Sequence, residues 1–160
     1  MKYLGLLLLV LGSFAAGKVY SLRLLKKPRL LSELAELVER LAEGARCYHR
    51  PYSITLAELS TGEGDIPSLA LTLAHSDSLA RGYSAWEGRR EIGEDGDALL
   101  SSLFSKLGGA ELSREVELLA SARDRLAALA GEAEKKARTD GKAAVLTAVA
   151  AGLGLALLLL

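Results

Sequence analysis

The sequence predicts an all-α protein, a small bundle of about five to six helices flanked by N-terminal and C-terminal transmembrane helices. Both ends of the chain are long uncharged apolar runs, and the segment between them repeats apolar residues at helical spacing. The predicted division is a first transmembrane helix over 1–23, a bundle domain over 24–141 and a second transmembrane helix over 142–160.

The C-terminal run 143–160 contains no charged residue, and Thr147 is its only polar side chain. As a helix it is about 27 Å long, close to the roughly 30 Å of a bilayer's hydrocarbon core. We therefore expect this run to cross a membrane.

The N-terminal run from Tyr3 to Gly17 is also uncharged, and Lys18 can extend to the headgroups. The run also fits a cleaved secretory signal peptide, with a small-x-small site at Ser13–Ala15. Only Lys2 precedes it, whereas five basic residues follow it closely: Lys18, Arg23, Lys26, Lys27 and Arg29. Because basic flanks mark the cytoplasmic side, this charge pattern favours a retained span.

The second apolar run gives the same orientation. Basic residues precede it and none follows: Lys135, Lys136, Arg138 and Lys142. Both basic clusters face the central segment, which predicts a two-span protein whose central domain is cytoplasmic.

Composition excludes several functions. The chain has 160 residues and a formal net charge of zero, which argues against nucleic-acid binding. Its single cysteine, Cys47, permits no intrachain disulfide. The two histidines, His49 and His75, lie far apart without a metal-ligand motif. We expect no metal and no cofactor.

The first half of the central segment predicts three helices. Pro28 should interrupt any helix that continues from the first span. From Leu30 to Ala45 the apolar residues form one helical stripe, and Pro51 requires an end before it. Ser53 can cap a short helix over 54–60. After a turn at 61–64, a helix with Pro67 in its first turn is predicted to reach about Gly82.

The second half predicts three more segments. A short helix is expected over 83–92, and Asp97 can cap the next one, which Gly108 and Gly109 end. Ser113 can cap the longest helix. At Asp140–Gly141 this helix either bends at a hinge or continues into the second span.

Catalytic chemistry is not predicted. Cys47 and His49 point in different directions on a helix, and the run 75–78 (His-Ser-Asp-Ser) has no triad geometry by adjacency alone. Four acids that lack calcium-loop spacing form a candidate docking surface for a basic partner: Glu91, Glu94, Asp95 and Asp97. Residues with predicted structural roles are Trp86, Pro51, Pro67 and Gly108. Small-residue pairs that allow close helix packing are Gly12 with Ala16 and Ala148 with Gly152.

Several segments in order resemble a known family. They are the leucine-rich helix that leads into 46–51, Ile66–Ser68, Gly82–Trp86, Leu107–Gly108 and 113–115, between two apolar ends. This layout resembles the stage III sporulation protein AB family of endospore-forming bacteria, over nearly the whole chain.

The resemblance implies a function. That family is similar to a reduced inner-membrane platform protein of type II secretion and type IV pilus systems. It implies a non-enzymatic platform or adaptor in the bacterial mother-cell membrane, within the complex that joins mother cell and forespore. Implied partners are the bilayer, other membrane subunits of that complex and a cytoplasmic secretion-type ATPase, the stage III sporulation protein AA-like subunit.

Two other hypotheses remain open from the residues. The first is an exported helical surface protein with a cleaved signal peptide and a C-terminal membrane anchor. The second is a membrane-bound hydrolase that uses His75 or Cys47.

Overall fold

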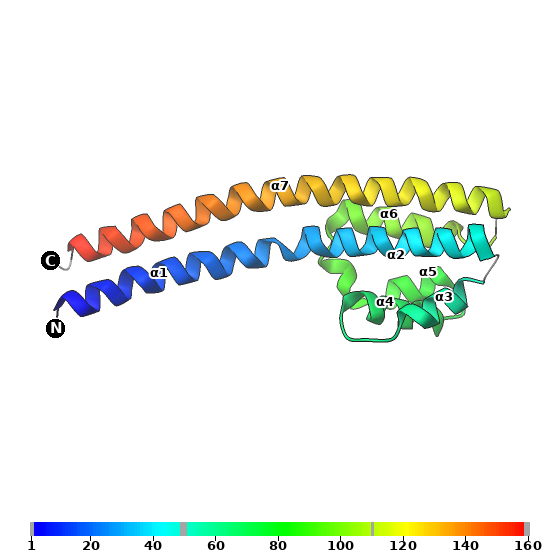
Figure 1. The fold of residues 1–160 in the computed structure, drawn as a ribbon, viewed down its shortest axis with the longest axis horizontal. Coiled ribbons are helices and arrows are strands. Elements are labelled where there is room, and N and C mark those ends of the chain that lie inside the picture. Colours follow the sequence, from blue (N-terminus) through cyan, green and yellow to red (C-terminus); the bar gives the residue numbers. More distant parts are fainter. Residues whose placement is uncertain (1, 49–50, 110, 159–160) are drawn as a thin grey trace. The chain divides into compact units, whose positions relative to one another are not determined.

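A computed structural model describes the backbone of residues 2–48, 51–109 and 111–158, and the side chains of 11–47, 51–109 and 111–155. Every regular element in these residues is helical, which confirms the all-α prediction (Figure 1). In chain order the elements are α1 (Lys2–Leu24), α2 (Lys26–Tyr48), α3 (Tyr52–Leu59), α4 (Asp65–Ala74), α5 (Leu79–Ala85), the 3-10 helix η1 (Glu87–Arg90), α6 (Gly93–Lys106) and α7 (Leu112–Leu158).

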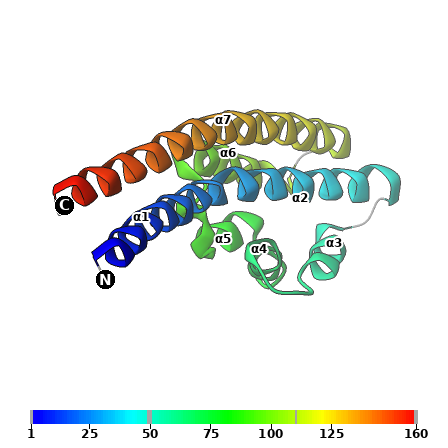
Figure 2. The same cartoon turned by 60° about the vertical axis from the view of Figure 1, so that its left-hand side comes forward.

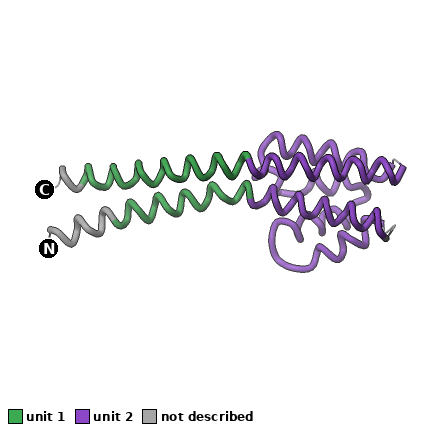
Figure 3. The backbone as a smooth tube through the Cα atoms, turned by 45° about the horizontal axis from the view of Figure 1, so that its top comes forward, with its two compact units in different colours: residues 1–28, 132–160 green, residues 29–131 purple. Residues whose placement is uncertain are grey.

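The chain divides into two compact units (Figure 3). The terminal unit comprises residues 1–28 and 132–160, and the bundle unit comprises 29–131. Helix α7 contributes its first part to the bundle unit and its remainder to the terminal unit. Residues 132–141 fall in the terminal unit, and the boundary at 141–142 between the bundle domain and the second transmembrane helix stays a prediction.

The break between α1 and α2 falls at Leu25, whose N–H donates to the Leu22 carbonyl at 3.2 Å. Pro28 is the third residue of α2. A proline has no N–H to donate and its ring clashes with the carbonyl four residues earlier, so an unbroken helix is disfavoured here. The predicted interruption at Pro28 is confirmed.

The bundle core is built on α2. All seven residues of its predicted apolar stripe are at most 2% exposed: Leu30, Leu31, Leu34, Leu37, Val38, Leu41 and Ala45. Leu119 and Leu126 of α7 and Leu100 and Phe104 of α6 are buried with them. In two views, α3, α4 and α5 lie on the side of α2 away from α7 (Figure 1 and Figure 2). The 3.6-residue period of the leucines therefore predicted the buried face of α2 correctly.

The predicted helix from Asp65 to Gly82 is wrong as a single element. Helix α4 ends at Ala74, and a new helix begins after Ser78, whose hydroxyl accepts from the Arg81 N–H at 3.3 Å. The side chains of Ser76 and Thr72 bond to backbone carbonyls instead of continuing a buried stripe, and Ala80 is exposed. Serines that can bond the backbone locally favour such a break.

Three other local predictions need correction, and one open alternative is decided. Helix α3 begins at Tyr52 after Pro51, without a side-chain cap from Ser53. Helix α6 begins at Gly93, so Asp97 lies inside it and is not its cap. The 83–92 segment divides into the end of α5 and η1. At 140–141, α7 is continuous and the hinge alternative is wrong.

Within this described part of the chain, no helix is both long enough and apolar enough to cross a bilayer. The predicted spans 1–23 and 142–160 include end segments, 1–10 and 156–160, whose side chains lie outside the described residues.

Candidate functional site

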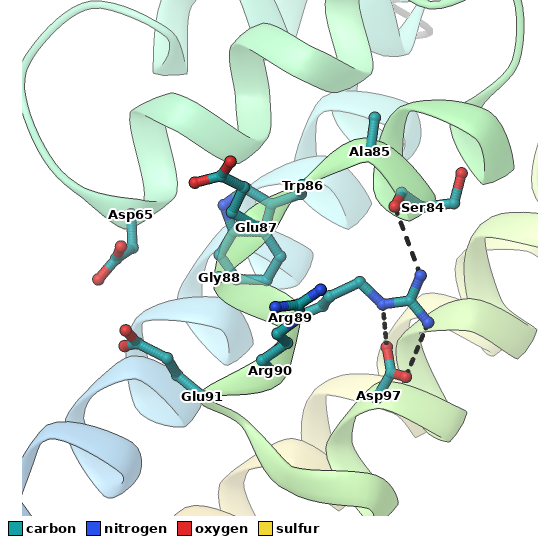
Figure 4. A pocket seen from close by; sticks show the side chains of 10 residues that line it. All are labelled: Asp65, Ser84, Ala85, Trp86, Glu87, Gly88, Arg89, Arg90, Glu91 and Asp97. Atoms are coloured by element: carbon teal, nitrogen blue, oxygen red, sulfur yellow. Dashed lines mark hydrogen bonds and ion pairs between the residues drawn. The ribbon is translucent and has the colours of Figure 1, made fainter.

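An open pocket of about 790 Å³ lies in the bundle unit where three segments of the chain meet (Figure 4). Asp65 comes from the first turn of α4, and Asp97 comes from α6. The remaining lining residues run from the end of α5 through η1: Ser84, Ala85, Trp86, Glu87, Gly88, Arg89, Arg90 and Glu91. Asp65 is therefore brought beside η1 only by the tertiary fold.

Asp97 forms one wall of this pocket through a closed polar network. The Arg89 guanidinium donates to both oxygens of Asp97, at 3.1 and 2.9 Å, and also to the Ser84 carbonyl at 3.4 Å (Figure 4). The buried Tyr83 hydroxyl donates to Asp97 at 2.8 Å. Two-point contact between a guanidinium and a carboxylate fixes geometry as well as charge.

This network shifts three pKa values. Arg89 holds the pKa of Asp97 below its usual range, mainly through its hydrogen bonds. Burial, followed by the hydrogen bond to Asp97, raises the pKa of Tyr83 well above its usual range. The pKa of Arg89 is raised in turn by Asp97. At neutral pH the network is therefore a carboxylate, a guanidinium and a neutral phenol.

The four acids of the predicted docking surface have different surroundings. Glu94 and Asp95 are exposed in the first turn of α6, where their charge favours the helix N-terminus. Glu91 lines the pocket, and Asp97 is held by Arg89 and Tyr83. Docking of a basic partner remains a prediction for this surface, and Glu94 and Asp95 are the members that face solvent without a bond inside the bundle.

A second constellation was missed by the sequence analysis. Glu115, in the first turn of α7, is only 6% exposed. One carboxylate oxygen accepts from the Tyr52 hydroxyl at 2.7 Å, and the other accepts from the Gly108 N–H at 2.7 Å. Burial and the bond to Glu115 raise the pKa of Tyr52 well above its usual range. The one signal in the sequence was the Ser113-Arg114-Glu115 run, which carries no information on burial.

The residues predicted to have structural roles occupy four different settings. Trp86 is 2% exposed, and its ring lies 6.2 Å from that of Tyr83. Pro51 precedes α3, and Pro67 is in the first turn of α4. Gly108 has φ +90°, a backbone conformation that favours glycine, and this conformation presents its N–H to Glu115.

The candidate hydrolase residues do not converge. His75 Nδ1 lies 3.0 Å from the Leu71 carbonyl, and Ser76 donates to the Thr72 carbonyl at 2.6 Å. Asp77 pairs with Arg81. Cys47 is exposed, and His49 lies outside the described residues. No group of three or more metal-ligating side chains occurs among the described residues.

In the terminal unit, α1 packs against the C-terminal part of α7 through small residues (Figure 3). A Cβ atom on Gly17 would lie 3.0 Å from the Ala148 Cβ and 3.2 Å from the Val145 Cα. A Cβ atom on Gly141 would lie 3.3 Å from the Ser21 Cβ. We call these five residues the terminal seam. Backbones this close require small side chains at the contact.

Of the two predicted small-residue pairs, one contributes a residue, Ala148, to the seam. Ala148 is half-buried and Gly152 is buried. By contrast, Gly12 and Ala16 are exposed, and a Cβ atom on Gly12 would have no neighbour within 4 Å. The packing stripe of α1 is one residue along, at Ser13, Gly17 and Ser21.

Comparison with known proteins identifies the family. The sequence model described as "Stage III sporulation protein AB (spore_III_AB)" matches residues 2–160. No curated protein and no solved structure matches the chain. Because the family match covers the chain almost from end to end, the chain belongs to the stage III sporulation protein AB family, and this membership implies a role in stage III of sporulation.

Proposed function

We propose that the chain is a non-enzymatic platform or adaptor protein of the secretion-like complex that links mother cell and forespore. Its bundle unit docks a cytoplasmic secretion-type ATPase, the stage III sporulation protein AA-like subunit. The observation that carries the proposal is the continuity of α7, which buries Leu119 and Leu126 in the bundle and runs on to Leu158. One helix thus belongs both to the candidate docking domain and to the apolar C-terminal run.

The proposal includes membrane attachment by both chain ends, in contact with the bilayer and with other membrane subunits of the complex. The apolar runs 3–17 and 143–160 and the basic residues that flank them on the central side support it. A cytoplasmic bundle unit follows from that charge pattern. The zero net charge supports a protein partner in preference to nucleic acid.

Docking is tested with the full chain in detergent micelles and the purified cognate ATPase. We expect the parent to bind, and the double variant Glu94→Lys/Asp95→Lys to bind at least about tenfold more weakly, because rim charges steer a basic partner. The matched control is Glu63→Lys/Glu117→Lys, which makes the same change in charge at exposed positions elsewhere in the bundle unit.

The outcomes separate the parts of the proposal. No binding by a folded parent to a folded ATPase would contradict the adaptor function. Equal weakening in both double variants would mean that total charge decides binding. Full binding by Glu94→Lys/Asp95→Lys would move the docking surface away from α6.

Localisation is tested with Cys47, the only cysteine in the chain, whose side chain is exposed. A membrane-impermeant maleimide should label it in permeabilised cells and not in intact cells. Labelling of intact cells would support the exported alternative. Mass spectrometry then provides the second check, since that alternative requires a mature N-terminus near Ala16.

A further inference from the structure

The terminal seam fixes the register of two segments that lie at opposite ends of the sequence. Gly17 lies against Val145 and Ala148, and Ser21 lies against Gly141. As the residue number rises along α1, from Gly17 to Ser21, the number of the contacted residue in α7 falls. The two helices are therefore antiparallel. Continuing this register from the three contacts places Leu11 level with residues 151–154, Val19 with 143–146 and Tyr20 with 142–145.

The register places the apolar run of α1 and the apolar run of α7 at the same level along the helix pair. The first lysine after the apolar run of α1 is Lys18, and the last lysine before the run of α7 is Lys142. Both lysine side chains are exposed. Along the helix pair they lie within about one helical turn of each other. An unrelated pairing of the helices would have placed charged residues of one beside the apolar run of the other.

The side chains that point away from the seam are large and apolar. Leu11 and Val19 are each 54% exposed, Leu146 is 70% exposed and Leu153 is 51% exposed. Phe14, Tyr20, Leu22 and Leu155 are also exposed. Large apolar side chains are more stable in an apolar phase than in water. The seam does not cover them, because each stays more than two fifths exposed while the helices are paired.

We propose that these outward side chains contact lipid acyl chains, and that α1 and the end of α7 form one hairpin with a single membrane boundary at Tyr20 and Lys142. This inference rests on the proposed membrane attachment and adds the register, the boundary and the lipid-facing sides. Three observations select lipid as the occupant: the length of the apolar runs, their shared level, and lysines placed where headgroup phosphates would lie. Tyr20 matches the interfacial position that tyrosines favour.

The boundary sets depths that can be measured. Leu11 is nine residues from Tyr20, or about 13.5 Å along a helix, which places it near the middle of a core roughly 30 Å thick. Leu153 should lie at the same depth because of the register. The sequence alone makes no such statement, since it does not pair residues of the two runs.

The test is depth-dependent quenching of tryptophan fluorescence by brominated lipids. Full-length Leu11→Trp, Leu153→Trp and Tyr20→Trp are each reconstituted into phosphatidylcholine vesicles brominated either near the chain ends or near the headgroup. The parent has one tryptophan, the buried Trp86, which supplies the background signal. We expect the deep bromines to lower emission from Leu11→Trp and Leu153→Trp by the same factor, and shallow bromines to quench Tyr20→Trp most strongly.

Val19→Trp and Leu146→Trp form a second pair, within about one helical turn of each other in depth, in case one of the deep variants does not fold. Depths that differ by more than about one helical turn within both pairs would overturn the hairpin register while leaving membrane attachment intact. Failure of the parent to float with vesicles would contradict the attachment itself. If the protein floats with vesicles but no variant is quenched, a second copy or another subunit covers these side chains. That result would also overturn the inference.

Discussion

The Tyr52 hydroxyl donates a hydrogen bond of 2.7 Å to Glu115, a residue 63 positions away in the sequence. The same carboxylate accepts from the Gly108 N–H. Glu115 therefore joins the start of α3 and the α6–α7 connection to the first turn of α7. Because Glu115 is almost fully buried, loss of these donors would leave its charge with fewer hydrogen bonds in a poorly solvated place, which is costly.

Substitution of this pair should reveal coupling. Tyr52→Phe is expected to lower the free energy of unfolding by about 1–2 kcal/mol, and Glu115→Ala by more, since Gly108 also loses its acceptor. In a double-mutant cycle the combined loss should fall short of the sum by about 1–2 kcal/mol. Chemical denaturation in detergent measures this, with Tyr20→Phe as an exposed control. Additive losses would show that the hydrogen bond contributes little.

Alkaline pH should destabilise the bundle through Tyr52 and Tyr83. Both tyrosines have raised pKa values in the folded chain, chiefly because burial disfavours the phenolate. Their contribution is therefore complete below the unfolded pKa of about 10, and is lost as pH rises above it. Melting curves between pH 8 and pH 12, compared with a Tyr52→Phe/Tyr83→Phe variant, test this. A parent and variant that lose stability in parallel above pH 10 would contradict it.

Gly82 should not tolerate a methyl group. A Cβ atom there would lie 2.7 Å from the Thr72 carbonyl oxygen and 2.8 Å from the Leu73 Cα, both backbone atoms of the α4 region. Gly82→Ala is expected to cost about 1–3 kcal/mol through overpacking. Gly131→Ala is the control, because a Cβ atom has no neighbour within 4 Å there and alanine favours a helix by up to about 1 kcal/mol. Thermal melting should move in opposite directions for the two variants.

The terminal seam should support a disulfide. A Cβ atom on Gly141 lies 3.3 Å from the Ser21 Cβ, close to the roughly 3.8 Å typical of cystines. In a Cys47→Ser background, Ser21→Cys/Gly141→Cys should form an intrachain crosslink on mild oxidation, detected by gel mobility. Gly12→Cys/Gly154→Cys is the matched control, since neither position has a neighbour within 4 Å. Equal crosslinking of both pairs would mean that the contact is not specific.

The buried face of a long helix could be predicted from the sequence, because the spacing of its apolar residues shows which side chains lie on one face. The apolar stripe from Leu30 to Ala45 in α2 is buried as its spacing predicted, and Leu119 and Leu126 of α7 are buried too. Short segments were less predictable. The division of 65–82 into two helices depends on serine side chains that form hydrogen bonds with the local backbone. Such bonds compete with continuation of the helix, and the spacing of apolar residues does not reveal them.

The candidate site depended almost entirely on tertiary contacts. The acidic composition of 91–97 was evident in the sequence, yet the roles of its members were not: Asp97 is held by Arg89 and Tyr83, whereas Glu94 and Asp95 face solvent. The burial of Glu115 was invisible for the same reason, since a carboxylate in a first helical turn is ordinarily exposed.

By itself, the sequence determined the all-α class, the apolar character of the two chain ends and the family, because composition, period and residue order are properties of the linear chain. Only the tertiary structure decided which small residues form the terminal seam, which pairs Gly17 with Ala148 and leaves Gly12 exposed. The physical reason is that a small-xxx-small spacing permits close approach on several faces of a helix. The choice among those faces depends on the partner helix, which in this chain is more than a hundred residues away.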